Sequence, residues 1–232
     1  MRSRMAADGV DPARVTIVPN AVDPADFPVM TRNEELATRL GIASTEVVVG
    51  YISSLVSYEG IDTLIKALRL ARDSGLPVRG LIVGDGDQRE SLEQLAATRG
   101  VADVVSFTGR VPYDQVLDYY SLIDIFVVPR RNDRVCRLVT PLKPFEAMST
   151  GRALVMSAVP ALADIASESG AAVTFEPENA ADLATVLTRL VGDEAARAAL
   201  ADQGATWVRA HRTWDDNAQR YLEIYRELGA TD

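Results

Sequence analysis

The chain has 232 residues, of which 47% are hydrophobic and 25% are charged, so it contains enough apolar material for a folded core. Its net charge of −9 argues against a general nucleic-acid-binding surface, although it does not exclude a local anion site. The single cysteine, Cys136, excludes an internal disulfide, and we find neither a signal-peptide core nor the roughly 20 apolar residues of a membrane span. We therefore expect a soluble, cytoplasmic protein.

In chain order, short β-branched runs alternate with helical patterns. The predicted strands cover residues 14–18, 47–53, 79–84, 104–109, 123–129, 152–157 and 171–177. The predicted helices cover residues 59–75, 87–100, 112–122, 141–151, 160–170, 179–191, 193–209 and 213–228. Because strands alternate with helices and the strands are apolar almost throughout, the pattern predicts an α/β fold with a doubly wound parallel sheet covered on both faces.

Four turns that follow predicted strands hold most of the unusual polar residues. These turns are 53–60, 84–87, 109–112 and 129–143. The carboxyl ends of parallel strands lie at one edge of a sheet, and ligands of open α/β sheets bind beyond that edge. We therefore expect the functional site where these four turns meet.

The turn 129–143 concentrates positive charge in an acidic chain. Its charged residues are Arg130, Arg131, Arg134, Arg137 and Lys143 against Asp133, a local charge of +4. We expect Thr140 to cap the following helix and Pro141 to be its first residue, which would leave the backbone N–H groups of Leu142 and Lys143 free. Free N–H groups at a helix start, together with a lysine, predict an anion site suited to a diphosphate.

Glu146 lies one helical turn after Lys143, and two interpretations of it remain open. It forms a surface ion pair with that lysine, or it accepts hydrogen bonds from a ribose, as an acidic residue does in dinucleotide-binding folds.

The remaining polar candidates give weaker signals. We interpret Gly84 and Gly86 as turn glycines that allow a ligand to approach closely, rather than as a phosphate cradle, because a third glycine is missing and Asp85 would repel phosphate. His211 is expected on the surface, and Cys136 is interpreted as a small apolar residue rather than a nucleophile. No Cys/His set has the spacing of metal ligands, so we expect neither a metal site nor a cofactor.

Several segments, in this order, resemble the C-terminal half of the retaining GT-B glycosyltransferases of family 4. They are "VTIVPNAVDPADF", "VGYISSLVSYEGIDTLIKAL", "LIVGDGDQRESLEQLA", "VSFTGRVP", "DIFVVPRR", "TPLKPFEAMSTGRALVMS" and "TWDDNAQRYLEIY". The resemblance implies a Rossmann-like sheet of about six strands with extra C-terminal helices. It also implies that residues 31–212 bind a nucleotide-sugar, that 1–30 lead from an absent acceptor-binding domain, and that 213–232 pack toward that domain.

The function implied by the resemblance is transfer of a sugar from a UDP- or GDP-linked donor with retained configuration, in polysaccharide or glycoconjugate synthesis. The donor-binding residues it implies are Ser53, Ser54, Arg110, Val111, Leu142, Lys143 and Glu146, to which we add Thr140 as the expected helix cap. Among them, Glu146 matches the second glutamate of the E-x7-E motif, which binds the ribose, and Arg110 and Val111 match the turn that holds the base.

The sequence departs from the family at the donor site. Leu138 stands where the first glutamate of E-x7-E is expected, so the catalytic residues stay unknown, and Ser54 and Glu59 stand where cations are usual. Our hypothesis is that cations of the turn 129–143 replace them on the diphosphate. The candidates are Arg130, Arg131, Arg134, Arg137 and Lys143.

Three other functions stay open: a degenerate binding or scaffolding module, a GT-B nucleotide-sugar epimerase, and a dehydrogenase-type dinucleotide binder, which the incomplete glycine fingerprint disfavours. The partners expected are the nucleotide-sugar and the absent domain, through which the protein would attach to the inner membrane.

The last helix has an apolar stripe of Trp214, Ala218, Tyr221, Tyr225 and Leu228. Two alternatives stay open: the stripe packs on this domain's own core, or it is exposed and drives self-association.

Overall fold

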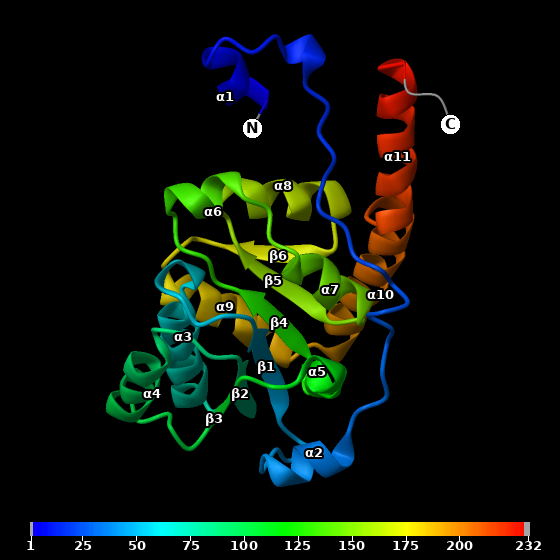
Figure 1. The fold of residues 1–232 in the computed structure, drawn as a ribbon. Coiled ribbons are helices and arrows are strands. Elements are labelled where there is room, and N and C mark those ends of the chain that lie inside the picture. Colours follow the sequence, from blue (N-terminus) through cyan, green and yellow to red (C-terminus); the bar gives the residue numbers. More distant parts are fainter. Residues whose placement is uncertain (1, 230–232) are drawn as a thin grey trace.

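Six parallel strands form a single sheet at the centre of residues 2–229, which are the residues that the computed structural model describes (Figure 1). The strands are β1 (Val47–Ile52), β2 (Val78–Val83), β3 (Val105–Gly109), β4 (Ile125–Val128), β5 (Ala153–Ser157) and β6 (Ala172–Phe175). Their order in the sheet is β3-β2-β1-β4-β5-β6. The chain reverses its direction of winding between β1 and β4, and ligands bind at that switch point in doubly wound folds. The predicted fold class is confirmed.

Helices cover both faces of the sheet. One face is covered by α2 (Glu34–Arg39), α5 (Val116–Leu122), α7 (Lys143–Ser149), α8 (Pro160–Ser169) and α10 (Glu194–His211). The other face is covered by α3 (Ile61–Asp73), α4 (Arg89–Thr98) and α9 (Ala180–Val191). Along β1, Val48 and Ile52 belong to the first core, and Val49 and Tyr51 belong to the second. This alternation explains why the strand is apolar at nearly every position.

Two local predictions are wrong. The run 14–18 forms no strand: it follows a 3-10 turn, η1 (Pro12–Arg14), and Ile17 is exposed. A β-branched run becomes a strand only where another strand offers backbone partners, and no described strand lies beside this run. The turn 129–143 contains a short helix that the sequence did not predict, α6 (Arg134–Leu138).

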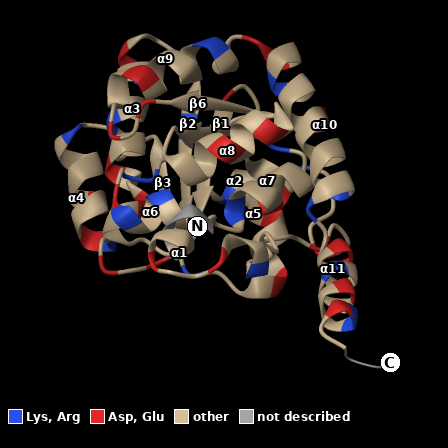
Figure 2. Ribbon diagram, turned by 90° about the horizontal axis from the view of Figure 1, so that it is seen from above, with Lys and Arg blue, Asp and Glu red and all other residues tan. Residues whose placement is uncertain are grey.

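The first residues and the last helix both extend beyond the sheet on the same side of the domain, apart from each other (Figures 1 and 2). The chain begins with α1 (Arg2–Ala7), which stands away from the sheet, and α11 (Trp214–Glu227) projects beyond α10 (Figures 1 and 2). The apolar stripe of α11 is exposed, with Tyr225 at 54% and Leu228 at 79%. The prediction that this stripe packs on the domain's own core is therefore wrong; the stripe is exposed, and its role in self-association stays a prediction.

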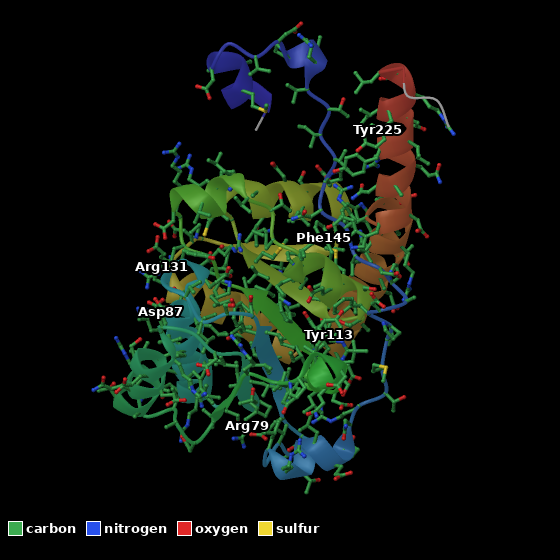
Figure 3. All side chains as sticks on the ribbon, viewed as in Figure 1. Arg79, Asp87, Tyr113, Arg131, Phe145 and Tyr225 are labelled. Carbon is green, nitrogen blue, oxygen red and sulfur yellow. The ribbon has the colours of Figure 1, made fainter. Side chains whose placement is uncertain are left out.

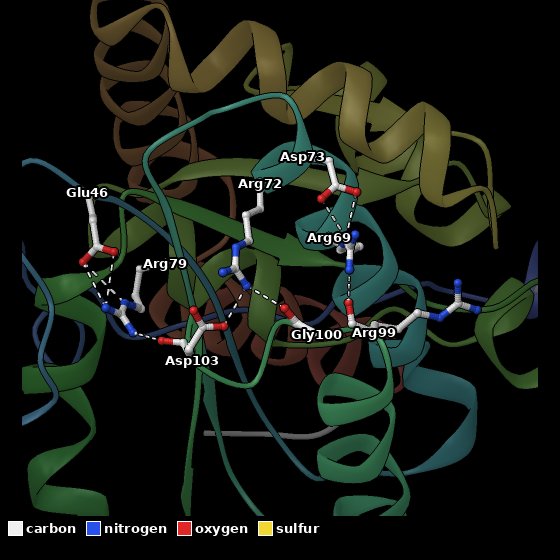
Figure 4. Close-up of polar contacts among 8 residues, drawn as sticks. All are labelled: Glu46, Arg69, Arg72, Asp73, Arg79, Arg99, Gly100 and Asp103. Carbon is white, nitrogen blue, oxygen red and sulfur yellow. Dashed lines mark hydrogen bonds and ion pairs between the residues drawn. The ribbon is translucent and has the colours of Figure 1, made fainter.

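An arginine network closes the sheet at the amino ends of β1, β2 and β3. Arg79, labelled in Figure 3, lies 3.3 Å from the Glu46 carboxylate and donates to the Asp103 carbonyl at 2.8 Å (Figure 4). Arg72 pairs with the Asp103 carboxylate at 2.7 Å. These contacts tie together the segments that enter the three strands, so the carboxyl ends form the edge that is open to a ligand.

None of the described helices combines the length and the apolar character needed to cross a membrane.

Candidate functional site

A cleft of about 430 Å³ opens at the carboxyl ends of β1, β2 and β3. Its lining residues are Ile52, Ser53, Ser54, Val83, Gly84, Asp85, Arg110, Val111, Tyr113, Val116 and Lys143. All four predicted turns therefore contribute to one cleft, the turn 129–143 through its last residue, Lys143, which reaches it from across the switch point. The volume lies within the range of ligand pockets, about 300–1,000 Å³.

The floor of the cleft is backbone packed against backbone. A Cβ on Gly84 would lie 1.8 Å from the Ser53 carbonyl oxygen, and one on Gly86 would lie 2.4 Å from that of Leu55. The same loops exchange hydrogen bonds, because the Leu55 N–H donates to the Asp85 carbonyl at 3.0 Å. The space beside both glycines is thus filled by the neighbouring loop. Gly84 nevertheless lines the cleft, so its interpretation as a glycine that allows a ligand to approach stays a prediction.

Helix α7 begins later than the sequence suggested. The Leu142 carbonyl accepts from the Phe145 N–H at 2.9 Å, which makes Leu142 the N-cap, and no side chain caps the helix. The prediction that Thr140 is the cap is wrong, because its own carbonyl is turned to the Asn20 side chain, which donates to it at 2.7 Å. With only seven residues, α7 has a small dipole. The positive charge on this side of the cleft therefore comes mainly from Lys143.

Glu146 is a buried carboxylate held on one side. Its Oε2 accepts from the Tyr120 hydroxyl at 2.8 Å and from Lys143 Nζ at 2.8 Å. Burial and the neighbouring Glu146 carboxylate raise the pKa of Tyr120 well above its usual value, so the phenol stays a donor. Glu146 is only 8% exposed and does not itself line the cleft, whereas its partner Lys143 does. The predicted ion pair with Lys143 is confirmed, although it is more buried than a surface pair.

Arg130 points away from the cleft, into a buried ion pair. Its Nη2 lies 2.7 Å from Glu59 Oε1, and its Nη1 donates to the Val139 carbonyl at 3.1 Å. The site of a Cβ on Gly60 is 2.1 Å from the Pro129 carbonyl, so the two loops also touch through backbone. Glu59 therefore serves as the partner of Arg130, and Arg130 is not available to a ligand in the cleft.

The other arginines of the turn are spread over separate surfaces. Arg131 lines a second cleft of about 260 Å³ beside α3 and α4, where it pairs with Asp62 at 2.8 Å. Arg134 and Arg137 lie exposed on α6, and so does Leu138. Of the five cations proposed as replacements, Lys143 alone lines the main cleft. The local charge of +4 therefore did not indicate which of these side chains face the cleft.

The remaining candidates occupy structural positions. Cys136 is buried, and burial raises the pKa of its thiol to about 11, which agrees with the interpretation of an apolar residue. His211 is exposed as expected, and its ring stacks on Trp207 with centroids 5.5 Å apart. Within residues 2–229, no cluster of His, Cys, Asp and Glu side chains could hold a metal ion, and the metal-free site stays a prediction.

The sequence interpretation missed two residues near the site, Tyr120 and Asn20, and the pairing of Glu59 with Arg130. Tyr120 and the pairing of Glu59 with Arg130 have no local signal, because each bond joins residues far apart in the chain. Asn20 lies in the motif "VTIVPNAVDPADF", but its side-chain partner could not be foreseen from that motif.

Comparison with known proteins gives consistent matches over most of the chain. The family model described as Glycosyl transferases group 1 matches residues 32–207. The D-inositol 3-phosphate glycosyltransferase of Thermomonospora curvata is 30% identical over a match that covers 97% of this chain and 53% of that protein. The chain thus spans about half the length of such curated relatives.

Two solved structures share the fold. HepE of Anabaena in complex with UDP and glucose superposes with a TM-score of 0.84 at 18% identity, over 97% of this chain and 60% of that one. The C-terminal domain of the glycosyl transferase group 1 family protein LpcC from Francisella tularensis gives a TM-score of 0.69 at 19% identity, over 82% of this chain and 97% of that one.

Proposed function

Because the chain belongs to the glycosyl transferases group 1 family, we propose that it is the nucleotide-sugar-binding half of a retaining glycosyltransferase. The donor is a sugar linked to UDP or GDP, and the acceptor binds to a domain outside residues 1–232. In this proposal residues 1–30 lead from that domain, 31–212 bind the donor, and α11 packs toward it.

One observation supports the proposal: Lys143, which pairs with the buried Glu146, lines the same cleft as the turn of Arg110 and Val111. We place the base beside Arg110 and Val111, which line the cleft. We place the diphosphate beside Lys143 and the ribose near Glu146, whose Oε2 lies 2.8 Å from Lys143 Nζ although Glu146 does not itself line the cleft.

The chemistry follows from the charge that develops on the donor. When the bond to the sugar breaks, negative charge grows on the leaving diphosphate, and a fixed cation stabilises that charge more than it stabilises the intact donor. Lys143 is held at 2.8 Å from Glu146, so it is already placed on the cleft wall before a ligand arrives. Groups that activate the acceptor would belong to the other domain.

Leu138 favours one alternative, a binding module without transferase activity. It is exposed on α6, at the position where the family resemblance places a carboxylate. Such a module would bind the nucleotide in the same cleft but would transfer no sugar when joined to its acceptor domain. A transfer assay on the complete protein distinguishes the two functions.

Calorimetric titration of the chain with UDP and GDP tests the proposal. We expect one of them to bind, and Lys143→Ala to weaken that binding by about 10- to 100-fold, because a charge-assisted hydrogen bond contributes about 1.5–3 kcal/mol. Arg134→Ala is the matched control: it removes a cation from the same turn, but this arginine lies exposed on α6. Absence of binding by both nucleotides, or equal losses in the two variants, would contradict the proposal.

A further inference from the structure

Residues 19–22, here called the strap, are fastened between α11 and the loop that precedes α7. The Val22 N–H donates to the Arg212 carbonyl at 2.9 Å, and the Asn217 side chain donates to the Pro19 carbonyl at 2.7 Å. Val22 and Asn217 are almost fully buried, so these bonds hold the strap firmly at the start of α11. From this fixed position, Asn20 reaches the Thr140 carbonyl at 2.7 Å.

The loop that receives this bond has few other anchors. Pro141 and Pro144 have no N–H to donate, and Thr140 itself is only partly buried. The Val139 carbonyl accepts from Arg130 at 3.1 Å, and the next carbonyl, that of Thr140, accepts from Asn20. Two consecutive carbonyls are thus held by two side chains that come from different parts of the fold.

The held segment leads directly to the cation of the cleft. Thr140 precedes Lys143 by three residues, and Lys143 lines the cleft while its Nζ contacts Glu146. A change in the direction of the Thr140 peptide would shift the start of α7, and with it the backbone N–H groups of Leu142 and Lys143. The position of these groups depends on how well the Thr140 carbonyl is fixed.

We propose that Asn20 is a positioning residue, which sets the loop 139–142 so that the start of α7 faces the cleft. The part of this inference that concerns ligand affinity rests on the proposed function, whereas the part that concerns loop order does not. Asn20 does not touch the cleft itself, since it is absent from the residues that line it.

Two variants that each remove one amide-to-carbonyl bond of the strap separate positioning from general stability. Asn20→Ala removes the bond to Thr140, and Asn217→Ala removes the bond to Pro19, which has the same length. We expect amide exchange in a peptide covering 139–146 to accelerate in Asn20→Ala. It should stay near the wild-type rate in Asn217→Ala, because the buried Val22 and its N–H bond to Arg212 still hold the strap. For the nucleotide that binds, UDP or GDP, we expect Asn20→Ala to raise the Kd by about 3- to 10-fold and Asn217→Ala by less than about 2-fold.

Each outcome decides a separate question. Unchanged exchange in Asn20→Ala would overturn the positioning role, and so would faster exchange accompanied by an unchanged Kd. If the wild-type chain binds neither UDP nor GDP, the proposed function fails, and the exchange measurement still decides whether Asn20 orders the loop. A similar Kd increase in both variants would show that the strap acts only through stability, against the inference.

Discussion

Replacing Glu59 by glutamine should strongly destabilise the protein, because it leaves the Arg130 guanidinium buried without a counter-charge. The two side chains are only 9% and 8% exposed, and their closest atoms are 2.7 Å apart. Removing one partner of a buried ion pair costs about 3–5 kcal/mol. Glutamine keeps one acceptor oxygen, so we expect Glu59→Gln to lie near the lower end, about 3 kcal/mol, out of a total stability of roughly 5–15 kcal/mol.

Urea unfolding at neutral pH measures this loss, provided that the slope of the transition stays unchanged. The double variant Glu59→Gln/Arg130→Met completes the cycle: with the buried charge gone, it should be more stable than Glu59→Gln alone. Asp73→Asn is the matched control, because the pair of Arg69 and Asp73 has the same 2.7 Å separation but is 42% and 49% exposed (Figure 4). This control should change the unfolding free energy by less than about 1 kcal/mol. Equal losses in Glu59→Gln and Asp73→Asn would refute the reasoning that burial makes the first pair important.

Three further predictions concern the thiol, the cleft floor and the last helix. The thiol of Cys136 should resist alkylation at pH 8 until urea unfolds the chain. Because burial raises the pKa of this thiol from 9.0 to about 11, the unfolded chain ionises first, and the free energy of unfolding should fall as the pH rises through that interval. Urea titrations at several pH values would detect this fall. Gly84→Ala should lower the free energy of unfolding by more than about 2 kcal/mol, because its Cβ would lie 1.8 Å from the Ser53 carbonyl oxygen. Gly75→Ala is the control: it also has a positive φ but no atom within 4 Å, so it should cost only about 1 kcal/mol. A loss for Gly84→Ala no larger than that for Gly75→Ala would contradict the close approach. Tyr225→Ser on the exposed stripe should change stability by less than about 0.5 kcal/mol while reducing any self-association seen by sedimentation, and a large stability loss would mean that the stripe is packed.

The sequence predicted the sheet well because the evidence for each central strand is local. The apolar run that became β4 is buried at all four positions, and its short length and β-branched residues favour a strand over a buried helix segment. The run 14–18 has similar residues but no neighbouring strand, and the absence of a neighbour cannot be read from the run itself.

The candidate site was predicted in place but not in detail. Ser53, Arg110 and Lys143 meet in one cleft because parallel strands bring their carboxyl ends together, which is a property of topology. The directions of the arginines depend on single partners such as Glu59, 71 residues before Arg130. Charge composition carries no information about such long-range pairs, so their roles required the fold.

The backbone contacts beneath the cleft restrict where this protein could be engineered. Because Gly84 and Gly86 press against the carbonyls of Ser53 and Leu55, the two loops cannot accept larger residues at those glycines and will shift only together. A mutant library designed to alter ligand choice should therefore leave Gly84 and Gly86 unchanged. The turn of Arg110, Val111 and Tyr113 is a better target, because it lines the same cleft and Tyr113 is 74% exposed.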